Sequence, residues 1–467
     1  MYSLDIRAGG KRMDAIEDFV GHVTRTTIDD VPEVAIRAAK TFILDSFGVG
    51  LSGGGGPWVD ETIQLSQQWG TGEQARVWGH GQALPAPSAA LCNAYQIHNA
   101  DFDCVHEGAV VHAMTVLLGG AMAVAERDGG VTGRDLMLAC VLGVDVACHI
   151  AVAVTTGLKF FRPGTAGALA AVTAIGKLEN FDGETLRNAY SIAYGQMCGT
   201  MQAHTEGSAL LGMQVGFNAR NAVVACDMAA AGLEGPINIL EGPFGFLRLF
   251  EGDYDREVLL GNIGKTWRIA ELSHKPYPSG RATHGIVDGC LRLQRQHGFA
   301  AHEIARIQAD VPPLIHHLVG RPVGETMTTN YARLCAQYVT AHALGRNGIG
   351  VDAYAEANLH DPQTIALARC IQIDIDDNPD PNALVPVSII ITLKDGGQHA
   401  ITVRDVYGSP ANAMSHQAHL EKFRGNCAAA PRPLAGAAVE GLIERIEDLE
   451  ALDDVTDLVD LMIPVRD

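Results

Sequence analysis

Residues 113–127, AMTVLLGGAMAVAER, and residues 133–154, GRDLMLACVLGVDVACHIAVAV, decide the fold of this chain. Both runs are rich in Ala, Gly and aliphatic side chains and stay apolar around most of a helix's circumference. A surface helix keeps one polar face, so these two runs predict central helices packed closely on all sides. They indicate a large helical domain with a core several helices thick.

The same apolar period of about 3.6 residues recurs through most of the first 270 residues, with Gly, Asp and Pro between the runs. Further helices are predicted over residues 32–46, 165–177, 183–199 and 216–231.

The pattern changes after about Ala270. Alternation of apolar and polar or β-branched residues predicts strands over 304–311, 370–376, 385–393 and 399–403, with Asp395-Gly396-Gly397 as a hairpin turn between the last two. Helical pattern persists over 284–297 and 331–344, which predicts a smaller α+β domain with an antiparallel sheet.

A helical return is predicted from Ala413, and its acidic, amphipathic segment 438–460 is suited to pack back on the first domain. The fold class is therefore mainly α. We predict a helical domain made from both chain ends, residues 1–270 and 408–467, and an α+β domain over residues 271–407.

Composition excludes several classes of function. The net charge of −20, with no basic stripe, excludes nucleic acid as an expected partner. No uninterrupted apolar run of about 18 residues predicts a membrane span, and residues 1–18 carry no secretory h-region, so we expect a cytoplasmic protein. The 10 cysteines form no C-x-x-C pair, which favours reduced thiols and predicts no metal site.

The stretch with most chemistry is Asp101-Phe102-Asp103, followed by His106 and His112. An imidazole that titrates near neutrality can remove a proton and return it, and a carboxylate can fix its tautomer. Asp101 and His112 are the candidate pair. In the alternative interpretation Asp101 hydrogen-bonds a loop and His112 only opens the helix that begins at Ala113. Cations at Arg162, Lys275 and Arg281 would suit small anions.

Several motifs, in their order and spacing, resemble the MmgE/PrpD family of dehydratases, decarboxylases and epimerases, over nearly the whole chain. They are Leu44-Asp45-Ser46, His98-Asn99-Ala100-Asp101-Phe102-Asp103, Gly235-Pro236, Glu241-Gly242-Pro243-Phe244-Gly245-Phe246, Lys275-Pro276-Tyr277-Pro278, Thr283-His284 and Gln337-Tyr338. The resemblance implies a homodimer, with a helical domain from both chain ends and a smaller α+β lid. It also implies an active site between the two domains, no organic cofactor, and substrates that are polycarboxylates or related small acids.

Position by position, the resemblance implies catalytic roles for Asp101 and His112 as an acid–base pair, with Lys275 and Tyr338. Lys275 and Tyr338 also have a structural interpretation. Lys275 could be a solvated residue before a Pro-Tyr-Pro turn, and Tyr338 could be an aromatic residue of the core. We expect His106, as a second proton carrier, to join the substrate site, although Glu107 offers it a simple partner.

Arg162, Arg281 and His284 are the other predicted substrate-binding residues, and Arg281 and His284 could equally be packing contacts. We take His98, three residues before Asp101, as a buried and hydrogen-bonded imidazole.

The chain departs from the family pattern at five positions. Arg162 stands where a histidine is common. We therefore expect the side chain at this position to bind an anion instead of transferring a proton. Leu211 stands where a lysine is common, and Gln214 stands where a histidine is common. Cys104 replaces a common aspartate, and Ala113 replaces a common proline. The loss of a cation removes a charge-assisted hydrogen bond worth about 1.5–3 kcal/mol, which disfavours a tricarboxylate bound in the family's usual way.

The resemblance implies a cofactor-independent lyase of dehydratase type that removes a proton beside the carboxylate of a small hydroxy-carboxylate. His112 would move the proton, Asp101 would orient it, and Lys275 and Arg162 would hold carboxylates. An isomerase or epimerase, or a decarboxylase of a related polycarboxylate, is the alternative. A catalytically silent protein that binds small acids is a hypothesis from another class.

Overall fold

The computed structural model describes residues 13–464, so the ends of the expected helical domain, residues 1–12 and 465–467, lie outside it. Helices dominate the architecture, as predicted. One large group, which we call the helical region, contains α1 (Ile16–Arg25), α2 (Glu33–Gly53), α3 (Val59–Trp69), α4 (Ala86–Asn99), α5 (Ala113–Asp128), α6 (Gly133–Val152), α7 (Arg162–Leu178), α8 (Gly183–Tyr194), α9 (Gln202–Glu206), α10 (Leu210–Ala230), α11 (Arg256–Gly261), α18 (His416–Ala428), α19 (Gly436–Glu447) and α20 (Thr456–Met462). A two-stranded ribbon of β1 (Ala75–Arg76) and β2 (Ala83–Leu84) joins it.

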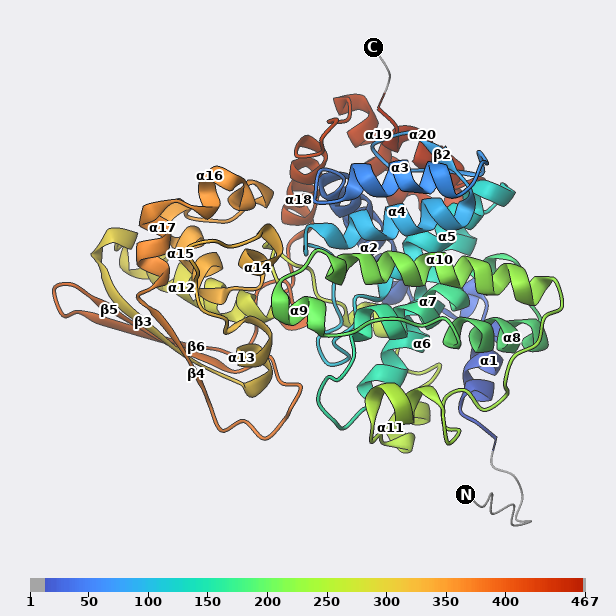
Figure 1. Ribbon diagram of the computed structural model, residues 1–467, viewed down its shortest axis with the longest axis horizontal. Coiled ribbons are helices and arrows are strands. Elements are labelled where there is room, and N and C mark those ends of the chain that lie inside the picture. The colour runs from blue at the N-terminus through green and yellow to red at the C-terminus, as the bar shows by residue number, and fades with distance from the viewer. Residues whose placement is uncertain (1–12, 465–467) are drawn as a thin grey trace.

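Helices α4, α5, α6, α7 and α10 pack together at the centre of the helical region (Figure 1). Their small residues allow close approach. A Cβ built on Gly143 of α6 would lie 2.3 Å from the Leu117 side chain of α5 and 2.7 Å from the Ala170 carbonyl oxygen of α7. Helix α6 is long and apolar enough to cross a membrane, but 89% of its most apolar window is buried in the fold. Its composition is that of a core helix, as the opening run predicts.

The C-terminal helices return to the N-terminal ones (Figure 1). The Val455 amide donates to the Val131 carbonyl over 2.8 Å, and the Gly79 amide donates to the Met462 carbonyl over 3.0 Å. The acidic tail therefore packs on the helices that begin the chain, with its apolar side chains Leu458, Val459 and Met462 buried.

The second group of elements, which we call the sheet region, surrounds a four-stranded sheet in the order β4-β3-β5-β6. The strands are β3 (Ile304–Val311), β4 (Ile371–Ile375), β5 (Val387–Leu393) and β6 (Gln398–Val403), and the helices are α12 (His284–His297), α13 (Pro313–Val319), α14 (Thr329–Arg333), α15 (Ala336–Arg346), α16 (Glu356–Leu359) and α17 (Pro362–Ala368).

All four predicted strands form, but the prediction of an antiparallel sheet is wrong for one pair. Strand β4 runs parallel to β3, with Ile307 opposite Ile371, whereas β5 is antiparallel to β3 and to β6. A parallel pair needs a crossover, which α13 to α17 supply. The predicted hairpin turn at 395–397 is confirmed by the amide of Leu393, which donates to the Gly397 carbonyl over 2.8 Å. The predicted helix 331–344 is split into α14 and α15.

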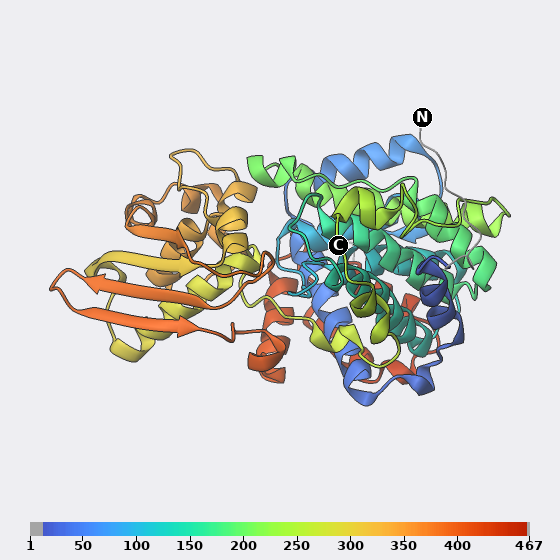
Figure 2. The same ribbon diagram turned by 90° about the horizontal axis from the view of Figure 1, so that it is seen from below.

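Helix α12 covers one face of the sheet through β5 and β6, where a Cβ on Gly289 would lie 2.4 Å from the Ile389 side chain. The chain crosses between the two regions twice, over residues 272–283 and 404–415. The crossings touch each other, because the His274 amide donates to the Gly408 carbonyl over 2.9 Å. In both views α18 lies at the boundary between the regions (Figures 1 and 2).

We expect Gly143→Ala to destabilise the protein by about 1–3 kcal/mol, because the added methyl group overpacks the contact of α6 with α5 and α7. Urea titration of the free energy of unfolding checks this. The matched control is Gly425→Ala, at a solvent-exposed position within α18 where a Cβ would meet nothing within 4 Å. This change should stabilise the helix by up to about 1 kcal/mol. Equal effects of the two substitutions would contradict the close packing.

Candidate active site

The main pocket lies between the two regions and encloses about 670 Å³, including the part open to solvent. The end of α4, the loop that follows it and the start of α7 line one side. The sheet region and the first crossing line the other side through Gly280, Arg281, Leu318, Val319, Leu334 and Leu384. Of the predicted site residues, Asp101, His112, Arg162 and Arg281 line this pocket.

The fully buried carboxylate of Asp103 organises the polar wall. One of its oxygens, Oδ2, accepts a hydrogen bond from His98 Nδ1 at 2.9 Å and another from the Thr115 hydroxyl at 2.5 Å. The same oxygen lies 3.0 Å from Nδ1 of His112, an ion-pair distance without hydrogen-bond alignment. The two imidazole rings meet edge to face, with centroids 5.0 Å apart. The carboxylate partner of His112 is therefore Asp103, whereas the sequence predicts Asp101.

Local structure places these groups. Helix α4 ends at Asn99, and Asp101 turns the chain with φ 49°, a left-handed conformation that Asp tolerates better than most residues. The loop is then pinned by paired backbone hydrogen bonds between Val105 and Ser273 of the first crossing. His112 stands at the N-cap position of α5, so it opens the helix as in the alternative interpretation and also lines the pocket.

The environments of the two imidazoles move their pKa values in opposite directions. Burial by itself would lower the pKa of His98, but the charge and hydrogen bond of Asp103, with help from Asp101, raise it above 6.5. Burial and the nearby Lys275 lower the pKa of His112 below 6.5 despite Asp103. Burial opposes ionisation of Asp103 as well, yet the two imidazoles hold its pKa well below its usual range.

Nδ1 of His98 and Nδ1 of His112 both lie beside the same oxygen of Asp103. The other ring nitrogen of each residue, Nε2, is therefore free to contact a ligand in the pocket. A neutral imidazole with a free Nε2 is a base, and a protonated one is an acid. The arrangement can therefore supply both halves of a proton-transfer reaction.

Lys275 lies outside the lining of the pocket. Its fully buried ammonium is 2.5 Å from Asp101 Oδ1, 3.1 Å from the Asp101 carbonyl oxygen and 3.8 Å from Asp103 Oδ1. Burial would raise the pKa of Asp101, but the charges of Lys275, His98 and His112 together more than offset this and lower it. In this geometry Lys275 holds Asp101 and does not line the pocket, and the catalytic role predicted for it stays a prediction.

Arg162 lines the pocket, but its guanidinium already has a partner. Nε and Nη2 donate to the carboxylate of Glu251 at 3.1 and 2.8 Å, and Nη1 donates to the Ala109 carbonyl at 2.8 Å. Both side chains are at most 3% exposed. The anion predicted for Arg162 is thus supplied by the protein itself.

Arg281 has a similar partner in Glu107, with Nη2 2.8 Å from Oε1, and it also donates to the carbonyls of His274 and Tyr407. His284 is fully buried behind it, with Nδ1 3.2 Å from Arg281 Nη1 and Nε2 3.3 Å from the Ser279 carbonyl oxygen. Burial and Arg281 push the pKa of His284 well below 6.5. His284 is a packing contact here and does not line the pocket.

Two further predicted residues lie elsewhere. His106 accepts from the Ala109 amide at 3.1 Å, which places its proton on Nε2, 2.9 Å from Glu271. Tyr338 is buried in a separate cluster and donates to the Ala353 carbonyl over 2.7 Å. Neither side chain lines the pocket, so the site roles predicted for them do not fit this geometry.

Sequence reasoning missed four groups of the site. His98 and Asp103 flank Asp101 in the quoted motif, and the neighbouring acidic and imidazole groups could have indicated them. His204 of α9 also lines the pocket, and burial and Arg321 lower its pKa to about 3. Arg333 lines an adjoining recess. No local signal marks His204 or Arg333, because their place depends on how distant segments pack.

Within residues 13–464, two groups of His and Asp side chains are close enough to share a metal ion. In the first, His98–Asp103–His112, Nδ1 of His98 donates to the carboxylate and Nδ1 of His112 lies 3.0 Å from it, which suits proton transfer better than metal ligation.

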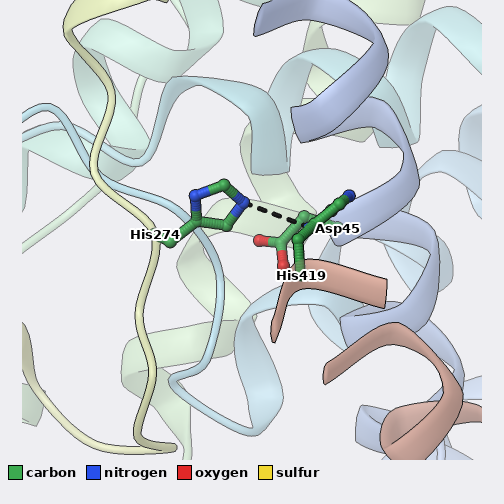
Figure 3. A group of neighbouring side chains, drawn as sticks. All are labelled: Asp45, His274 and His419. Atoms are coloured by element: carbon green, nitrogen blue, oxygen red, sulfur yellow. Dashed lines mark hydrogen bonds between the residues drawn. The ribbon is translucent and has the colours of Figure 1, made fainter. Parts of the chain in front are cut away.

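The second group is Asp45, His274 and His419, from α2, the first crossing and α18 (Figure 3). Nε2 of His274 lies 3.2 Å from Nδ1 of His419, and Nζ of Lys422 lies 2.7 Å from Oδ1 of Asp45. Lys422 also donates to the Phe102 carbonyl over 3.0 Å. Because this ammonium balances Asp45, the cluster links the crossing to the Asp101–Asp103 loop without an added cation. The prediction that no metal is needed stays a prediction.

Comparison with known proteins gives one consistent family. The MmgE/PrpD N-terminal domain matches residues 17–259, and the MmgE/PrpD C-terminal domain matches residues 277–441. The cis-aconitate decarboxylase of Mus musculus is 27% identical, covering 96% of this chain and 93% of its own length. The cis-aconitate decarboxylase of Homo sapiens is 28% identical, covering 95% of this chain and 92% of its own length. That of Aspergillus terreus is 26% identical, covering 93% of this chain and 93% of its own length.

We expect Glu251→Gln to destabilise the protein by about 3–5 kcal/mol, because it leaves the buried Arg162 guanidinium without a counter-charge. Urea titration of the single variant and of the double variant Arg162→Met/Glu251→Leu checks this, and the double variant should recover most of the loss. Glu440→Gln, which breaks the exposed pair with Arg424, should cause no measurable loss. A single variant as stable as the parent would contradict the buried pair.

Proposed function

The chain belongs to the MmgE/PrpD family as an enzyme of lyase type, and on that premise we propose that it is a cofactor-independent dehydratase of a small hydroxy-carboxylate. The observation that carries the proposal is the buried Asp103 between two imidazoles whose pKa values move apart. Such a pair offers a base and an acid on one wall of a pocket.

In the proposed reaction, Nε2 of neutral His112 removes a proton from the carbon beside the substrate carboxylate. The C–H electron pair forms the new C=C bond, the C–O bond breaks, and the hydroxyl leaves as water with a proton from His98. Asp103 stabilises the charge that develops on His112, because it lies 3.0 Å from Nδ1 and remains ionised. A positioned acid or base contributes roughly 10²–10⁴ in rate.

A decarboxylase is the second candidate, supported by the similarity to proteins named cis-aconitate decarboxylase. Loss of CO₂ also needs a proton donor at the carbon that keeps the electron pair, and His98 would serve. An epimerase, which exchanges a proton on two faces and expels nothing, is a further alternative.

We also propose that the two regions are separate domains, residues 1–270 with 408–467 and residues 271–407, and that the smaller one closes on the larger as a lid. The paired crossings at His274 and Gly408 and the lining of the main pocket from both sides support this. A homodimer and a cytoplasmic location are proposals that rest on the family resemblance and on the composition.

We expect His112→Ala to lower turnover at least about a hundredfold with the fold intact, because it removes the base. Proton NMR in D₂O with hydroxy acids that carry one, two or three carboxylates provides the measurement. An alkene signal indicates dehydration, loss of CO₂ indicates decarboxylation, and deuterium beside the carboxylate without an alkene indicates epimerisation.

The matched control is His106→Gln on the same loop, which should retain activity because His106 faces Glu271 and not the pocket. Full activity of His112→Ala, with circular dichroism unchanged, would refute the proposed role of His112.

The pH profile should reflect the opposed shifts of the imidazoles. Activity needs neutral His112, so it falls as pH drops through an apparent pKa below 6.5, and it needs protonated His98, so it falls as pH rises through an apparent pKa above 6.5. His98→Asn should remove the alkaline limb and keep the acid limb. A profile of kcat/KM against pH that leaves both limbs in place in this variant would exclude His98 as the acid.

A further inference from the structure

A second, smaller hollow adjoins the main pocket. His98, Asp101, Leu211 and Leu334 line both spaces. The smaller one, which we call the recess, is completed by Asn99, Ala209, Gly212, Asn330 and Arg333. A ligand in the main pocket can therefore extend into the recess past His98 and Asp101.

The cations around the main pocket are already neutralised. Arg162 is paired with Glu251, Arg281 with Glu107, and Lys275 with Asp101. A carboxylate that entered here would have to displace the paired anion of one of these cations or remain without a counter-charge. Either alternative is costly, because each cation is itself buried.

Arg333 in the recess differs from these cations. Arg333 as a whole is 6% exposed, and its Nη1 donates to the Asn99 carbonyl and lies 3.5 Å from the Asn330 side-chain oxygen. Its carbon Cζ lies 5.1 Å from the ring centroid of Tyr354. Its Nε has no hydrogen-bond partner, and no carboxylate of residues 13–464 forms an ion pair with it.

A buried guanidinium cannot lose its proton near neutral pH, so its charge needs a partner. The planar N–H groups of arginine match the two oxygens of a carboxylate. An acid bound in the recess would supply the missing anion. Asp101 lines the same recess, but Lys275 already holds its carboxylate.

The rest of the main pocket is apolar. Its remaining lining is dominated by side chains that offer neither charge nor hydrogen bonds: Val105, Val110, Leu158, Phe161, Pro163, Met201, Leu211, Ala282, Leu318, Val319, Leu334 and Leu384. Such a wall stabilises hydrocarbon by about 25 cal/mol per Å² of apolar surface that is removed from water.

We propose that the substrate is a monocarboxylic acid with a short hydrocarbon chain, whose carboxylate binds Arg333 in the recess and whose chain lies in the main pocket. This inference rests on the proposed function, since it places the carbon beside the carboxylate where the recess opens into the main pocket, near both His98 and His112, whose ring centroids are 5.0 Å apart. A second or third carboxylate would fall on aliphatic side chains and paired cations. The pocket therefore selects against the di- and tricarboxylates that the family resemblance implies.

Affinities of unreactive acids for the unaltered protein test the substrate class directly. Pentanoate and glutarate share a five-carbon chain and differ by one carboxylate, and propane-1,2,3-tricarboxylate carries three. Calorimetry or ligand-observed NMR should show pentanoate binding at least about tenfold more tightly than either of the others. Equal or tighter binding of glutarate or the tricarboxylate would overturn the proposal.

Variants test the role of Arg333. Arg333→Gln should weaken pentanoate binding about tenfold or more, because it removes a charge-assisted pair, and Arg333→Lys should retain part of the affinity. The matched control is Arg321→Gln. Arg321 also lies over a tyrosine ring, at 5.0 Å from Tyr331, and donates to a backbone carbonyl, but it lines neither hollow. Circular dichroism verifies the fold, and equal losses at both positions would refute the recess as the carboxylate site.

The outcomes separate this inference from the proposed function. A reaction that depends on His112 but occurs only with polycarboxylates would keep the function and overturn the substrate class. Binding of monocarboxylates through Arg333, with no reaction of hydroxy-monocarboxylates in D₂O, would keep the recess and refute the dehydratase. Turnover of hydroxy-monocarboxylates that is lost in both His112→Ala and Arg333→Gln would support both.

Discussion

The ionised carboxylate of Asp103 is the constraint on which the rest of the site depends. It is fully buried, and one oxygen faces His98, His112 and Thr115 while the other faces Lys275. An isolated carboxylate could not remain charged there, so the neighbouring imidazoles and ammonium must be held in place. This requirement explains why the loop from Asp101 to His112 is fixed at both ends, by α4 and α5 and by the first crossing.

The same rule governs the other charges at the boundary between the regions. Arg162 and Arg281 at the pocket, and Lys275 behind Asp101, each have a carboxylate of their own. Burial of such pairs contributes little net stability, but removal of one partner is costly. The protein therefore presents a pocket that is close to neutral and largely apolar, whereas Arg333 in the adjoining recess forms no ion pair with a carboxylate of residues 13–464. An acid with a single carboxylate fits this pocket better than a tricarboxylate does.

The position of the site follows from how the chain crosses between the regions. The first crossing carries Arg281 to the pocket and Lys275 to Asp101, and the second crossing lies beside the first through His274 and Gly408. Beneath them, Lys422 of α18 connects Asp45 of α2 to the carbonyl of Phe102. These contacts connect the two crossings to the Asp101–Asp103 loop, and they come from distant parts of the sequence.

The sequence by itself determined the helical class, the central helices, the four strands and the motif that contains the proposed acid–base groups. These features depend on local periodicity and on neighbouring residues, which a chain carries whatever its tertiary structure. Only the tertiary structure decided that β4 runs parallel to β3, that Asp103 instead of Asp101 partners His112, and that Tyr338, His106 and His284 face away from the pocket. It also placed Glu251 on Arg162 and Arg333 in the recess. Such pairings join residues far apart in the chain, and their geometry is set by packing that no local pattern encodes.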